Sequence, residues 1–189
     1  MVTVKWCLQQ KNGLEFIEPS KTIADSYIKM AEESISILQG VEKSKIWTAT
    51  TTYYIYYYSL YSLMLGIGIK CEIHSCSLQF MGKYLTIFYD RRDIEMINKA
   101  FSARIDLQYY ANRPVDSKII EETKRHCTAF FVKTKDILST ISEKQIKNVR
   151  ESLKKELNPR ANYKRSRNIM PNARSGTVFL YPGRGTFFL

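Results

Sequence analysis

The chain of 189 residues has a mass of 22.1 kDa and a formal net charge of +11 at pH 7. This length favours one folded core with an appendage over two domains, and the hydrophobic and charged fractions, 44% and 25%, are ordinary for a globular protein. The chain does not open with a charged-then-apolar secretion signal, and its four cysteines lack the density and spacing of a secreted disulfide scaffold. We therefore expect a cytoplasmic protein.

The basic residues are concentrated at the end of the chain. Residues 144–189 hold 11 of the 29 Lys and Arg residues but only 2 of the 18 Asp and Glu residues. This asymmetry is typical of a basic tail and not of a uniformly basic domain.

A leader, residues 1–19, precedes the first predicted helix and contains WCLQQKNGLEFIE, which is compatible with a short extended segment. In residues 21–40 apolar side chains then recur at a spacing near 3.6, which predicts an amphipathic helix. Ser20 is its expected N-cap and Gly40 its expected stop.

The stretch from Ile46 to Ile69 carries no charge and suggests a membrane span, a wall of the core or a binding surface. Its Thr and Ser residues and six tyrosines argue against a span, because phenol groups need polar partners at the depth of a bilayer. A helix that is apolar all round is typically buried. We therefore expect a central helix with one face in the core and another against a second subunit. The tyrosines assigned to this interface are Tyr53, Tyr54, Tyr57, Tyr58 and Tyr61.

Three more helical stripes follow, opening near His74, after Tyr89 and at Asp116, which is a plausible N-cap. The segment ISEKQIKNVRESLKKEL is typical of a solvated basic helix that runs out of the bundle. The predicted fold is all-α: an up-and-down bundle of four to five helices over residues 20–157, followed by an irregular basic C-terminal tail.

The tail, residues 158–189, contains three of the five prolines and shows no helical period, although TVFLY suggests a short extended segment. One interpretation is an arm that binds nucleic-acid phosphates. Its basic residues are Arg160, Lys164, Arg165 and Arg167. The other interpretation is a flexible extension with an apolar end.

Few residues suggest chemistry. Cys71, His74 and Cys76 lack the paired Cys-x-x-Cys spacing of a zinc site, so we predict no metal and no cofactor. His74 opens a helix, where a positive charge is disfavoured, so a neutral imidazole is expected there. His126 has no nucleophile beside it in the sequence and is expected to be packed or solvent-facing.

The order of these segments resembles the HEPN superfamily (higher eukaryotes and prokaryotes nucleotide-binding domain), in its prokaryotic and archaeal branch. The resemblance covers about residues 20–141 and rests on MAEESISIL, ATTTYYIYYYSLYSLML, HSCSLQFMGKYL and ARIDLQYY. It implies a helical bundle that pairs into a homodimer. Many members act with a nucleotidyltransferase as toxin–antitoxin partners, and active members are metal-independent ribonucleases with an R-x(4–6)-H motif.

The chain departs from that motif. Arg104 matches the arginine, but Tyr109 stands where the histidine is expected. A phenol, with an ordinary pKa near 10, is a poor proton shuttle at neutral pH. Arg104 has two interpretations: a structural partner of Asp106 or of a carboxylate from the partner helix, or a fork presented to a phosphate. Gln108 shares its helix face at i+4, and Tyr109 or Tyr110 would supply a ring or hydroxyl.

Three hypotheses follow from the sequence. The first is a non-catalytic homodimeric HEPN module that binds a nucleotidyltransferase, a nucleotide or RNA. The second is a degenerate ribonuclease in which Arg104, Asp106 and Tyr109 act on RNA. The third is a structural helical dimer with an RNA-binding tail. The missing histidine favours the first, and none of the three places the protein in a membrane.

Overall fold

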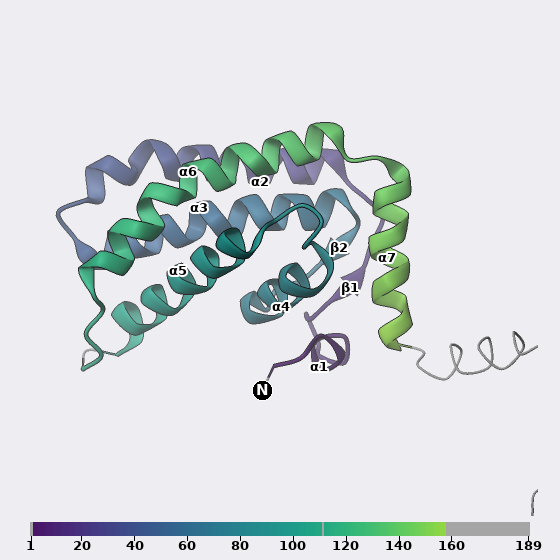
Figure 1. Ribbon diagram of the computed structural model, residues 1–189, viewed down its shortest axis with the longest axis horizontal. Helices are drawn as coiled ribbons and strands as arrows, with labels where there is room; N and C mark the ends of the chain where they lie inside the picture. The colour runs from purple at the N-terminus through teal and green to yellow at the C-terminus, as the bar shows by residue number, and fades with distance from the viewer. Residues whose placement is uncertain (1, 111, 158–189) are drawn as a thin grey trace, which may run out of the picture. The chain divides into compact units, whose positions relative to one another are not determined.

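A computed structural model describes residues 2–110 and 112–157 (Figure 1). These residues form seven α-helices, one short 3-10 helix and a single pair of two-residue strands, which confirms the all-α fold class. The basic residues Arg160, Lys164, Arg165 and Arg167 and the TVFLY segment lie outside the described residues.

The elements follow one another along the chain with short connections. They are α1 (Val4–Cys7), β1 (Glu15–Phe16), α2 (Lys21–Leu38), η1 (Gln39–Val41), α3 (Lys45–Gly66), β2 (Ile69–Lys70), α4 (His74–Tyr84), α5 (Arg91–Tyr109), α6 (Ser117–Thr140) and α7 (Glu143–Leu157). The long helices α2, α3, α5 and α6 form the body of the bundle, while α7 crosses one end of it (Figure 1). Ser20 and Asp116 are N-caps, as predicted.

Helix α3 is the central element and packs against α2, α5 and α6. Most of its circumference is buried, and its serines find partners inside the protein: Ser62 Oγ donates to Ala24 O at 2.8 Å, and Ser59 Oγ donates to Ile55 O at 2.6 Å. The uncharged stretch is therefore a wall of the core. Among the described residues, no helix is both long enough and apolar enough to cross a membrane.

The leader is part of the folded body and not a separate segment. Strand β1 pairs antiparallel with β2, with Glu15 opposite Lys70 and Phe16 opposite Ile69. Cys7 of α1 forms a disulfide with Cys76 of α4 across a sequence separation of 69. Cysteine spacing did not predict this bond, because the two residues meet only after α1 has packed against α4.

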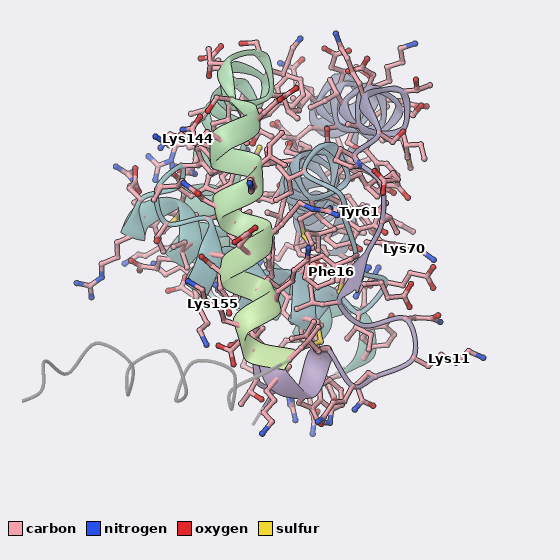
Figure 2. The ribbon with its side chains drawn as sticks, turned by 90° about the vertical axis from the view of Figure 1, so that its right-hand side faces the viewer. Lys11, Phe16, Tyr61, Lys70, Lys144 and Lys155 are labelled. Carbon is pink, nitrogen blue, oxygen red and sulfur yellow. A yellow bond between two sulfur atoms is a disulfide. The ribbon has the colours of Figure 1, made fainter. Side chains whose placement is uncertain are left out.

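The prediction that the last basic helix leaves the bundle is wrong. Helix α7 buries Val149 and Leu153, and its Arg150 Nη1 donates to Ile17 O, Ile67 O and Gly68 O at 2.9, 3.1 and 2.5 Å. Figure 2 looks onto α7, with Lys144 and Lys155 along it and Phe16 beside it. The many charged side chains of this segment suggested a solvated helix. Its two buried apolar residues, Val149 and Leu153, are four positions apart and pack one face of α7 against the bundle.

Candidate anion site at Arg104

Three helices bring a tyrosine-rich cluster together around one arginine. Helix α3 contributes Tyr53, Tyr54 and Tyr57, α4 contributes His74 at its first position, and α5 contributes Arg104. The turn between α3 and β2 requires Gly68. Its φ of 76° is in the left-handed region, and a Cβ at this position would meet Arg150 Nη1 at 2.0 Å. This turn returns the chain so that His74 faces α3.

The guanidinium of Arg104 lies against aromatic rings. Its Cζ is 5.9, 5.7 and 5.4 Å from the ring centroids of Tyr53, Tyr54 and Tyr109, distances at which a cation is attracted to ring faces. Its Nη2 makes only long contacts, at 3.5 Å to Tyr54 Oη and 3.4 Å to Tyr109 Oη. Its Nε is buried and has no hydrogen-bond partner among the described residues.

His74 is held against the same tyrosines. Its Nδ1 lies 2.7 Å from Tyr53 Oη, and its ring stacks on Tyr57 with centroids 3.8 Å apart. Burial, together with the positive charge of Arg104, lowers the pKa of His74 to about 4, so the imidazole is neutral at pH 7. This agrees with the neutral imidazole expected from the sequence. Burial also raises the pKa of Tyr53, so we assign its hydroxyl as the donor to Nδ1.

The other residues predicted beside Arg104 are arranged differently from the expectation. Asp106 pairs with Arg113 at 3.2 Å and is not the partner of Arg104 among the described residues. Tyr110 carries the Arg113 guanidinium over its ring at 3.7 Å, while Gln108 is half-buried. The contact between Arg104 and Tyr109 forms despite their angular separation on the helix, because both side chains are long enough to bridge it.

The interface predicted for the tyrosines of α3 needs correction. Tyr53, Tyr57 and Tyr61 are buried inside the protomer, at 0%, 6% and 5% exposure, so they are core residues and not surface residues. A helix packed on three sides leaves little surface for a partner. Tyr54 and Tyr58 are half-buried and reach the surface, where their ring centroids lie 5.1 Å apart.

The sequence did not predict that His74 belongs to the Arg104 cluster, because 30 positions separate the two residues. The only available signal was a histidine at a helix start in a chain with two histidines. The set Cys71, His74 and Cys76 cannot act together as metal ligands, since the Cys76 sulfur is bonded to Cys7 and Cys71 Sγ donates to Ile73 O at 3.3 Å.

His126 lies in a separate cluster, against Tyr56 of α3. Its Nδ1 is 3.1 Å from Tyr56 Oη, and its Nε2 is 3.4 Å from a carboxylate oxygen of the buried Asp93. Burial lowers the pKa of His126, although the Asp93 charge acts in the opposite direction. The residue contacts α3 and α5, which is the packed one of the two arrangements expected from the sequence.

Comparisons of the chain with models of protein families, with curated proteins and with solved structures found no match. The chemistry of the Arg104 cluster is therefore the basis for a function. The cluster offers a permanent positive charge with unused donor capacity, phenol hydroxyls and a neutral imidazole. Such groups suit a bound anion.

Proposed function

We propose that this protein binds the phosphate of a nucleotide or of RNA at Arg104 and does not cleave it. The observation that carries this proposal is the state of the Arg104 guanidinium, which is half-buried and has no carboxylate partner among the described residues. A buried charge normally has a close partner, and two hydroxyl contacts of 3.4 and 3.5 Å are weak. A phosphate oxygen would supply the missing acceptor.

The rings around Arg104 also suit the rest of a nucleotide. Tyr109 is 64% exposed and presents its ring beside the guanidinium. Tyr54 and Tyr58 are half-buried and lie next to each other, so they also present some ring surface. Bases stack on tyrosine rings with little preference for sequence. These contacts favour single-stranded RNA or a free nucleotide over an anion without a ring.

The residues at this site are poorly suited to proton transfer. His74 already shares its Nδ1 with Tyr53, and its lowered pKa leaves it a weak base at pH 7. A degenerate ribonuclease using Arg104, Asp106 and Tyr109 is the second candidate, favoured by the 3.4 Å contact between Arg104 Nη2 and Tyr109 Oη. Asp106 is paired with Arg113, which argues against its role in catalysis.

The proposal includes a homodimer, with a nucleotidyltransferase as a further partner, in the cytoplasm. The supporting feature for the homodimer is a stripe on α2 formed by Ile23, Met30 and Ile37. These three apolar residues are exposed and lie seven positions apart, so they follow one face of the helix. The solution mass tests the pairing: a strictly monomeric protein at high concentration would refute it.

Binding of a fluorescein-labelled single-stranded RNA dodecamer to the full chain tests the main proposal. Arg104→Ala is expected to weaken binding by at least about tenfold, the effect of losing a charged hydrogen bond. Arg125→Ala is the matched control, since Arg125 is exposed on α6 and its hydrogen bond within the described residues is to Glu121 O of the same helix, so this variant should bind as the wild type does.

Two further arms separate the alternatives. Replacing Arg160, Lys164, Arg165 and Arg167 together by Gln tests the RNA-binding tail; if this change abolishes binding while Arg104→Ala does not, the Arg104 site is refuted. The same RNA on a denaturing gel tests cleavage. Cutting by the wild type that Arg104→Ala and Tyr109→Phe both abolish would support the degenerate ribonuclease instead.

A further inference from the structure

The start of the chain holds the segment that leads into His74. Strand β1 pairs with β2, and Glu72 N donates to Asn12 O at 2.9 Å. The disulfide then joins Cys7 of α1 to Cys76, two residues after His74. The leader is therefore bonded to the chain before His74, at β2 and Glu72, and after it, at Cys76.

The first turn of α4 has no side-chain cap. Its N-cap residue, Ile73, makes no side-chain capping hydrogen bond, so the helix start lacks the usual local anchor. Helix α1 has only four residues, but it buries Val4 and Cys7 and packs against α4 and α7, so it can serve as an anchor for α4. Besides the contacts of the imidazole itself with Tyr53 and Tyr57, the covalent bond between Cys7 and Cys76 restrains the position of His74.

We propose that the Cys7–Cys76 disulfide sets the ligand affinity of the Arg104 site by fixing His74 against Tyr53 and Tyr57. This proposal rests on the proposed function. His74 stacks on Tyr57 and bonds to Tyr53, while the ring of Tyr53 lies under the Arg104 guanidinium. Release of the first turn of α4 breaks the hydrogen bond to Tyr53 and the stacking on Tyr57, which support the ring under the Arg104 guanidinium.

The chemistry is a two-electron thiol–disulfide exchange. A thiolate of a dithiol attacks one sulfur of the bond, the Cys7–Cys76 bond breaks, and the second thiol of the reagent resolves the mixed disulfide. The products are two protein thiols and the cyclic oxidised reagent. Both cysteines are at 0% exposure, so the reaction requires α1 to open first. Since a cytosol keeps thiols reduced, the site would respond to oxidising conditions there.

The position of His74 can be followed without any ligand. The chain has two histidines, so NMR resolves two imidazole signals, and His126→Gln assigns them. The groups that face His74 are Tyr53, Tyr54 and Tyr57 of α3 and Arg104 of α5. Reduction by dithiothreitol, with the open bond verified by mass, is expected to move the pKa of His74 from about 4 towards its ordinary value of 6.5.

The affinity arm uses the RNA dodecamer with oxidised and reduced wild type. Reduction should weaken binding by about fivefold, the lower end of usual coupling between sites. The double variant Cys7→Ala, Cys76→Ala should bind like reduced wild type in both buffers. Cys127→Ala, equally buried but free, should keep the redox response.

The outcomes separate the two proposals. If the RNA does not bind in either redox state but the His74 titration still shifts on reduction, the proposed function fails and the control of His74 by the disulfide holds. An unchanged His74 titration in verified reduced protein, or equal RNA affinity in both redox states, overturns the inference. Absence of the disulfide from protein treated with oxidised glutathione overturns it as well.

Discussion

Tyr53 Oη and His74 Nδ1 lie 2.7 Å apart, and this hydrogen bond joins the centre of α3 to the first residue of α4. Tyr53 is fully buried, so the bond lies in a region of low polarity, where an unmade hydrogen bond is expensive. The same ring lies under Arg104. One phenol therefore links the core of the bundle to the candidate anion site.

Tyr53→Phe tests the importance of that bond. The substitution keeps the ring but leaves His74 Nδ1 without its donor, so we expect the free energy of unfolding to fall by about 1–2 kcal/mol. The pKa of His74 should also rise, because the lost hydrogen bond favoured the neutral imidazole. Urea unfolding measures the first effect. Tyr58→Phe is the control, since the structure shows no hydrogen bond from Tyr58 to another described residue, and equal losses in both variants would contradict the prediction.

Acid is expected to destabilise the fold through its two histidines. In the unfolded chain a histidine has a pKa near 6.5, whereas burial lowers the pKa of His74 to about 4 and also lowers that of His126. As the pH falls from about 6.5 towards about 4, the unfolded chain binds protons that the folded chain does not, so the free energy of unfolding decreases.

Urea unfolding at a series of pH values measures this decrease. The double variant His74→Gln, His126→Gln should show a flatter dependence over the same interval, whatever its stability at pH 7. Each single variant should lie between the double variant and the wild type. Identical slopes in the wild type and the double variant would assign the acid sensitivity to carboxylates.

Much of the fold follows from local sequence signals. The uncharged stretch predicted the buried α3, and Ser20 and Asp116 marked the starts of two helices because their side chains accept backbone N–H groups nearby. The Cys7–Cys76 bond and the docking of α7 were not predicted, since both join residues far apart in the chain.

The candidate site shows the same division. Arg104 was identified from the sequence, and so was its neighbour Tyr109 on the same helix. Asp106 was expected as the partner of Arg104 because it is close in sequence. In the structure Asp106 instead forms an ion pair with Arg113, which follows α5 in the chain. Tyr53 and His74 meet Arg104 only through the packing of three helices, which no local spacing encodes.

Arg150 is expected to be important for the docking of α7. Its Nη1 donates to three carbonyls, Ile17 O of the leader and Ile67 O and Gly68 O after the C-terminal end of α3. We expect Arg150→Ala to lower the free energy of unfolding by about 2 kcal/mol, because the carbonyls lose a charged donor. Lys147→Ala, an exposed residue one turn earlier, should change it by less than about 0.5 kcal/mol. Equal effects in urea unfolding would show that α7 docks through its apolar residues alone.

Asp93 connects three helices from a buried position. It lies at 1% exposure in the first turn of α5, where its Oδ2 accepts from Lys133 Nζ at 2.5 Å and from Asp90 N at 3.1 Å. Its Oδ1 faces His126 Nε2 at 3.4 Å, and the other imidazole nitrogen of His126 reaches Tyr56 of α3. The carboxylate thus connects α5 directly to α6 and, through His126, to α3.

Replacing this carboxylate by an amide leaves Lys133 without its closest buried counter-charge. We expect Asp93→Asn to lower the free energy of unfolding by about 2 kcal/mol, because a buried carboxylate loses a charged hydrogen bond, while the partly exposed Lys133 keeps its pair with Asp90. Glu95→Gln is the matched control, because Glu95 pairs with Lys99 on the exposed face of the same helix and such pairs contribute less than about 1 kcal/mol. If urea unfolding gave similar losses for both variants, the Asp93 cluster would be no more important for the association of α3, α5 and α6 than a surface ion pair.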